Sequence, residues 1–73
     1  MLTAAAYRVD YATSDAPDRP VVLDATGRDD AISQARRLSR SHGTAYAIRS
    51  VAGQDTGQAV YCGGSFSHFD DTF

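Results

Sequence analysis

The side chains best suited to covalent chemistry are one cysteine, Cys62, and two histidines, His42 and His68. A cysteine nucleophile needs a base within hydrogen-bonding reach and a third group that orients the base. Alternation along residues 58–63 predicts that Cys62 faces the helix, where a free cysteine acts as a small hydrophobic residue. His42 lies at the C-terminal end of the expected helix, where a positive charge interacts favourably with the helix dipole. We therefore expect no enzymatic activity.

A metal site near the C-terminus would draw on Cys62, His68, Asp70 and Asp71. Their spacing matches no common ligand pattern, and one short segment would have to complete a tetrahedral site alone. The neighbouring Gly63-Gly64 pair opens no helix and precedes no Lys-Ser or Lys-Thr, so it is not a phosphate loop. It more simply ends a strand or allows a bulge. We expect no metal and no cofactor.

Three arginines, Arg36, Arg37 and Arg40, lie close together on the expected helix and could contact phosphates. No aromatic residue shares their helix face, and the chain has no lysine. The net charge of −2 and the pI near 5.4 also differ from the usual basic footprint of a nucleic-acid-binding domain. A solvated helix face is the simpler interpretation, and nucleic-acid binding stays the alternative.

The charge is distributed unevenly along the chain. Its seven basic residues are all arginine and its nine acidic residues are all aspartate. Five arginines fall within residues 28–49, whereas residues 1–27 and 50–73 are net acidic. Such a bipolar surface can steer a protein partner, although an ordinary solvated exterior would also carry this charge.

The C-terminal tail, residues 64–73, contains Phe66, Phe69 and Phe73. This tail is too apolar for a purely disordered end. The rings either fold back over the core or form an exposed patch that a partner buries. Asp70 and Asp71, beside Phe69, would complement a basic surface.

The elements that must position these residues follow from hydrophobic periodicity and turn signals. Strands are expected at about residues 5–12, 21–25, 44–52 and 58–63, with a helix at about 27–42. Residues 13–20 and 53–57 have turn compositions. The predicted fold is a single α+β domain over residues 1–73, with a four-stranded, mainly antiparallel sheet and one helix on one face (ββαββ).

The helix has the clearest local signals. Thr26 is the expected N-cap, with Asp29 three residues later as in a capping box, and Gly43 is the expected left-handed residue after the last turn. Helical spacing gives a buried face made of Ala31, Ile32, Ala35, Leu38, Ser39 and His42. Many of these side chains are small, so the helix can lie close to a sheet.

The sheet face without a helix is the expected partner-binding surface. By alternation it would present Arg8, Asp10, Asp24, Arg49 and Tyr61. An antiparallel sheet often leaves one face to water. We therefore name as candidate partner-binding residues Arg8, Asp10, Arg49, Tyr61, Phe69, Asp70 and Asp71.

Two resemblances bear on function. The run Thr26-Gly-Arg-Asp-Asp-Ala-Ile-Ser-Gln-Ala-Arg-Arg-Leu, followed by Gly43 and a strand, resembles the helix of small bacterial ββαββ domains and of the N-terminal part of HicB-type antitoxins. No DNA-binding segment follows it here. As a class, a free-standing, acidic α+β domain of this size is similar to small phage-encoded inhibitors, including anti-CRISPR proteins. That resemblance implies binding to a host complex and blockade of its nucleic-acid site or nuclease recruitment; it carries over no individual residues.

The sequence thus predicts a non-catalytic protein-binding module, and the resemblance implies a phage or mobile-element inhibitor. Its expected partner is a host protein or nucleoprotein complex in the cytoplasm, and it would act as a monomer or homodimer. No apolar run approaches the 18 residues that suggest a membrane span, so no membrane contact is expected. The alternative is a small nucleic-acid-binding regulator, similar to an antitoxin, that uses Arg36, Arg37 and Arg40.

Overall fold

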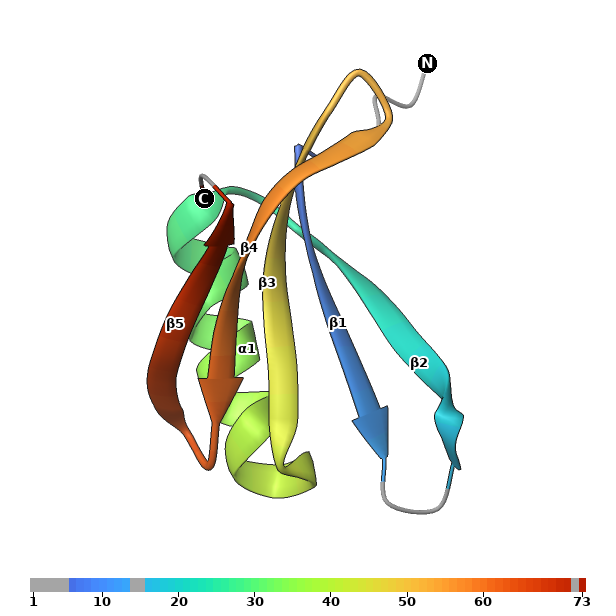
Figure 1. The fold of residues 1–73 in the computed structure, drawn as a ribbon, viewed down its shortest axis with the longest axis vertical. Coiled ribbons are helices and arrows are strands. Elements are labelled where there is room, and N and C mark those ends of the chain that lie inside the picture. Colours follow the sequence, from blue (N-terminus) through green and yellow to red (C-terminus); the bar gives the residue numbers. More distant parts are fainter. Residues whose placement is uncertain (1–5, 14–15, 72) are drawn as a thin grey trace.

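The computed structural model describes residues 6–13, 16–71 and 73. Their elements follow the order β1 (Tyr7–Thr13), β2 (Ala16–Ala25), α1 (Arg28–His42), β3 (Thr44–Val51), β4 (Gln54–Cys62) and β5 (Ser65–Asp71) (Figure 1). The α+β class with one helix is confirmed. The sheet has five strands instead of the expected four, because the tail forms β5, and the fold is ββαβββ.

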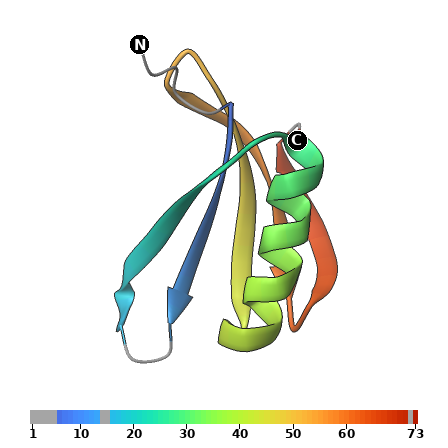
Figure 2. The ribbon, with the colours of Figure 1, turned by 180° about the vertical axis from the view of Figure 1, so that it is seen from behind.

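The sheet has the strand order β2-β1-β3-β4-β5, and every neighbouring pair is antiparallel. The helix α1 packs on one side, which we call the helix side (Figure 2). The opposite side, turned toward the viewer in Figure 1, is called the open face. Strand β5 is one edge of the sheet and β2 is the other, so the tail and the N-terminal hairpin lie at opposite margins.

Strand β1 extends to Thr13 and β2 begins at Ala16, so the expected turn over residues 13–20 is largely strand and that prediction is wrong. Residues 14 and 15 lie outside the described residues. Pro20 lies inside this strand and not at its start. An edge strand tolerates proline because the missing N–H can face away from the ladder. The pairing register also shifts between Tyr11 and Thr13. The proline signal for a turn was therefore outweighed by the position of β2 at the sheet edge.

Two short turns differ from the expected connections. Ala52 and Gly53 join β3 to β4 with φ of 54° and 79°, so the expected five-residue connection over 53–57 is wrong. Gly63 and Gly64 join β4 to β5 with φ of 60° and 85°. Positive φ at both central residues is the hairpin geometry that matches strand twist. Gly63-Gly64 thus ends a strand as expected, and also reverses the chain into another one.

The helix matches its sequence signals closely at its C-terminal end. Gly43 has φ of 100° and its N–H donates to the Ser39 carbonyl at 2.8 Å, as predicted for the residue after the last turn. At the other end Thr26 is not the cap. Instead Asp30 Oδ2 accepts from the Thr26 backbone N–H at 2.9 Å, and this bond is the main reason that the pKa of Asp30 is lowered.

The core lies between α1 and the sheet and is made mostly of alanine. Its buried members are Val9, Ala25, Ala31, Ala35, Ala45, Ala47, Ala59 and Tyr61. Small side chains bring the helix close to β1 and β3. The one buried polar side chain among the described residues, Ser39, donates to the Arg36 carbonyl at 3.0 Å and accepts from the Gly64 N–H at 2.9 Å. Ser39 therefore ties the β4–β5 turn to the helix.

Candidate functional site

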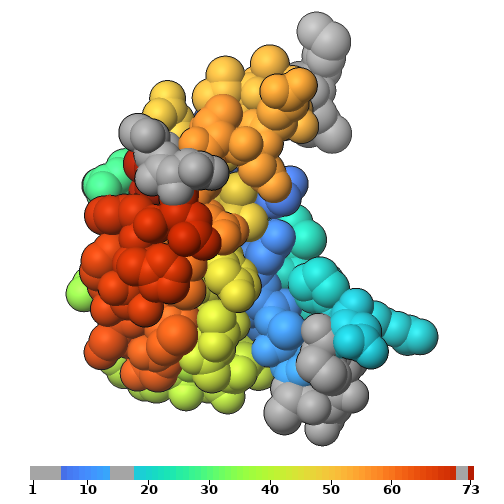
Figure 3. Space-filling model, viewed as in Figure 1, coloured from blue at the N-terminus to red at the C-terminus, as the bar shows by residue number. Residues whose placement is uncertain are grey.

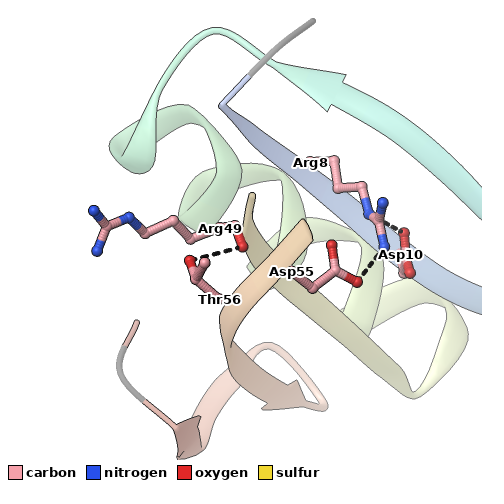
Figure 4. Close-up of polar contacts among 5 residues, drawn as sticks. All are labelled: Arg8, Asp10, Arg49, Asp55 and Thr56. Carbon is pink, nitrogen blue, oxygen red and sulfur yellow. Dashed lines mark hydrogen bonds and ion pairs between the residues drawn. The ribbon is translucent and has the colours of Figure 1, made fainter. Parts of the chain in front are cut away.

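The open face carries an ion cluster centred on Arg8. The Arg8 Nη2 donates to Asp55 Oδ2 at 2.7 Å, and its Nε lies 3.4 Å from Asp10 Oδ1 (Figure 4). Asp24 pairs opposite Arg8 on β2 and shares this face. Arg8, Asp10 and Asp24 therefore lie on the face that alternation predicted.

Asp10 is the least well solvated of these carboxylates. Its Oδ1 and the facing Arg8 Nε are both buried, and neither forms a hydrogen bond. Burial raises the pKa of Asp10, the Arg8 guanidinium partly offsets that rise, and the negative charge of Asp55 adds to it. The charged form of Asp10 is thus incompletely compensated within the chain.

Arg49 and Tyr61 do not lie on the open face, which corrects the prediction for both. Arg49 pairs with Tyr7 and Gly57 on the helix side, and its side chain points away from the Arg8 cluster (Figure 4). Tyr61 is 3% exposed and belongs to the core. The helix packs against the alanine face of β3, because small side chains permit close approach, so the larger Tyr46 and Ile48 face outward.

Cys62 is likewise on the opposite side from the one expected. It is exposed, pairs with Thr44, and its Sγ lies 3.9 Å from Thr44 Oγ1. Within residues 6–13, 16–71 and 73, no group of three or more histidine, cysteine or acidic side chains is arranged to hold a metal ion.

A hollow of about 480 Å³ opens on this face, which Figure 3 shows in space-filling form. Its lining residues are Asp10, Tyr11, Ala12, Pro20, Tyr46, Ile48, Gln58, Val60, His68 and Asp70. Ile48 and Val60 are 4% and 5% exposed and form an apolar floor. A smaller hollow of about 230 Å³ shares Ile48, Gln58 and Asp70 and extends to Asp55. We call the two together the acidic furrow.

The β5 side of the furrow is organised around Asp70. Gln58 Nε2 donates to Asp70 Oδ2 at 2.7 Å, and His68 Nε2 lies 3.4 Å from Asp70 Oδ1. Asp71 pairs with Gly57 through β5, but its side chain lies outside the described residues. Phe69 pairs with Ala59, on the helix side. Asp70 and Phe69 therefore point to opposite sides of the sheet and cannot act as one patch.

The helix side of β5 carries a row of aromatic rings. The ring centroids of Tyr61 and Phe66 are 5.6 Å apart, those of Phe66 and Phe69 are 4.7 Å apart, and those of Phe69 and Phe73 are 6.1 Å apart. Phe66 and Phe69 are 44% and 51% exposed. The tail thus packs as a strand, yet two of its rings stay half in solvent.

Arginines of α1 lie beside this row. The Arg28 guanidinium carbon is 5.7 Å from the centre of the Phe73 ring. Burial raises the pKa of Tyr61, and the nearby charges of Arg36 and Arg28 partly offset that rise. Arg40 lies against Gly64, so closely that a Cβ there would meet Arg40 Nε at 3.0 Å. We call the surface formed by Arg28, Arg36, Arg40, Phe66, Phe69 and Phe73 the arginine–phenylalanine ledge.

The predicted arginine cluster is therefore divided. The charge of Arg37 acts on Asp30, whereas the charge of Arg36 acts on Tyr61 and Arg40 lies against Gly64 in the β4–β5 turn. Arg28 was missed by the sequence reasoning. Its place eight residues before Arg36 was only a weak signal, since 3.6 residues per turn put the two positions about 80° apart around the helix.

Comparison of the chain with protein-family models, curated proteins and solved structures finds no match. Among the described residues, no helix is both long enough and apolar enough to cross a membrane.

Proposed function

We propose that this protein is a non-catalytic protein-binding module and that its acidic furrow binds a cationic segment of a protein partner. The observation that supports this proposal is the arrangement of Asp10, Asp55 and Asp70 along a furrow with an apolar floor. Asp10 and Asp55 share the one guanidinium of Arg8, and no arginine among the described residues lines the furrow itself. The furrow is therefore negative and has room for side chains.

An arginine side chain is the ligand that this furrow suits. Its guanidinium can donate two parallel hydrogen bonds to one carboxylate, while its apolar stem can cover hydrophobic residues such as Ile48 and Val60. Asp10 contributes most directly, because its ionised form is incompletely compensated by Arg8. A partner cation beside Asp10 would stabilise that form.

Arginine-rich protein surfaces commonly hold nucleic-acid phosphates. A protein that covers such a surface with its own carboxylates prevents the nucleic acid from binding. This steric, charge-mimicking blockade is the mode of action implied by the resemblance to small phage-encoded inhibitors. We accordingly propose that the partner is a host protein or nucleoprotein complex and that this chain inhibits it.

The proposal can be tested with a labelled peptide of alternating arginine and glycine, with binding followed by fluorescence anisotropy and by amide chemical shifts. We expect the shifts to concentrate at furrow residues such as Tyr46, Gln58 and His68. Asp10→Asn and Asp70→Asn should each weaken binding by about 1.5- to 5-fold, the range for one exposed ion pair.

Asp18→Asn is the matched control, because it removes the same charge from an exposed position on β2. Equal weakening by all three variants would show that only net charge matters and would overturn the proposed site. A shift pattern spread over α1 instead of the furrow would overturn it as well.

A further inference from the structure

The arginine–phenylalanine ledge lies on the opposite side of the sheet from the acidic furrow. It runs the length of β5: Arg40 lies at the Gly64 end and Arg28 lies at the Phe73 end. Figure 2 shows α1 and β5 side by side along this margin. The ledge therefore consists of two adjacent rows, one of guanidinium groups and one of phenyl rings.

We propose that this ledge binds single-stranded nucleic acid, with the arginines contacting phosphates and the exposed rings of Phe66 and Phe69 stacking on bases. Aromatic side chains beside a positively charged track are the general requirements for holding a single strand. This binding is a further activity, separate from the function proposed for the acidic furrow.

The spacing of the arginines suits a strand of phosphates. With a rise of 1.5 Å per residue, Arg28 and Arg36 lie about 12 Å apart along the helix axis and Arg36 and Arg40 about 6 Å apart. A stacked strand advances about 3.4 Å per nucleotide, so these steps correspond to roughly two to four nucleotides. The half-exposed rings lie alongside, where unpaired bases would be.

Three sequence features argued against nucleic acid: the absence of aromatic residues on the arginine face of the helix, the absence of lysine, and the net negative charge. The fold removes the objection about aromatic residues, because β5 places its phenyl rings beside the helix. It also places Asp10, Asp55 and Asp70 at the furrow, on the other side of the sheet from the ledge. The net charge of −2 predicts modest affinity, and three phosphate contacts predict that log K falls with log salt with a slope of about −2.

The experiment is a fluorescence-anisotropy titration of labelled oligothymidine at several salt concentrations, with a duplex of the same length as comparison. We expect the single strand to bind more tightly than the duplex, because paired bases cannot stack on the rings. Phe69→Leu should weaken binding about 5- to 160-fold, the range for loss of one base–aromatic stack, whereas Phe69→Tyr should retain it.

The arginines are tested by a pair of variants on one helix. Arg36→Ala should make the negative slope of log K against log salt shallower by about 0.7, the value for one phosphate contact to a single strand. Arg37→Ala removes the same charge on the other side of α1 and should change the slope by less. Amide spectra of each variant confirm that it is folded.

Equal binding by wild type and Phe69→Leu would overturn the proposal, as would equal effects of Arg36→Ala and Arg37→Ala. A duplex that binds as well as the single strand would also overturn it. An acidic, phenylalanine-containing peptide that binds the ledge more tightly than oligothymidine would assign the surface to a protein instead.

Discussion

The two sides of the sheet are built from the same strands and have opposite chemistry. On β5, His68 and Asp70 face the acidic furrow, whereas Phe66 and Phe69 face the ledge. The furrow is concave and negative, with an apolar floor that is already buried. The ledge is positive along α1 and leaves two phenyl rings half exposed. Alternation together with the register shift opposite Val60 and Tyr61 thus lets one edge strand give a small domain two unlike surfaces.

This difference separates residues that hold the fold together from residues available to a partner. Tyr61 and Phe69 belong to the same row of rings, yet Tyr61 is 3% exposed and Phe69 is 51% exposed. Substitutions can therefore test which part of the row is core and which part is surface.

The largest expected effect is that of Tyr61→Ala. Loss of a buried aromatic ring costs about 3–5 kcal/mol, which is as much as the core of a domain this small supplies. We expect this variant to be largely unfolded in thermal and urea denaturation. Phe69→Ala should cost only about 1 kcal/mol, because its ring is half exposed. Similar losses for the two variants would contradict the division into core and ledge.

The next largest effect is expected from Ser39→Ala, which removes the bonds to Gly64 and Arg36. It leaves the partly buried Gly64 N–H without its acceptor, at a cost of about 1–3 kcal/mol. The β4–β5 turn would then be less firmly attached to α1, so oligothymidine binding should fall while binding of the arginine peptide persists. Urea denaturation and both titrations measure this.

Ser41→Ala provides the comparison for that result. The Ser41 hydroxyl is exposed and donates to the Arg37 carbonyl at 3.4 Å, on the same helix. Its loss should change the free energy of unfolding by less than about 0.5 kcal/mol. If Ser41→Ala destabilised the protein as much as Ser39→Ala, the buried link to Gly64 would not be the cause.

The smallest effect is a pH-dependent one at Asp10. A raised carboxyl pKa means that the folded state binds the proton more tightly than the unfolded chain. The cost of ionising Asp10 is absent below its ordinary pKa and fully present above the raised one. Asp10→Asn should therefore be more stable than the wild type at neutral pH, and this difference should vanish as the pH falls through the carboxyl range.

Urea denaturation at a series of pH values measures this difference, with Asp18→Asn as the exposed control. The same Asp10→Asn variant is expected to bind the arginine peptide more weakly. A variant that is both more stable and weaker in binding would indicate that the charge at Asp10 is retained for binding. Loss of stability at neutral pH would instead mean that the Arg8–Asp10 pair stabilises the fold.

Local signals accounted for much of the fold. The helix predicted over 27–42 is observed over Arg28–His42, and Gly43 ends it as expected, because a helix and its caps depend on residues near in sequence. Strand β5 was missed although Gly63-Gly64 is a hairpin signal, because Phe66 and Phe69 are three residues apart and do not show strand alternation. The aromatic residues after it were interpreted as a tail, because a strand is stable only with a neighbour.

Alternation also predicted which residues share a face, but not which face meets the helix. Arg49, Tyr61 and Cys62 were each assigned to the wrong side for this reason, whereas Arg8 and Asp10 were placed correctly. The ledge could not be predicted, since it brings Arg28 on α1 next to Phe73, a residue far from it in the sequence.

The sequence by itself determined the α+β class, the helix and its C-terminal end, and the alternation of β1, β3 and β4, because these follow from patterns within a few residues. Only the tertiary structure decided that the alanine face of β3 packs against the helix and that β5 places its rings beside the α1 arginines. Those outcomes depend on how closely two surfaces can approach. That is a property of both surfaces together and not of either segment alone.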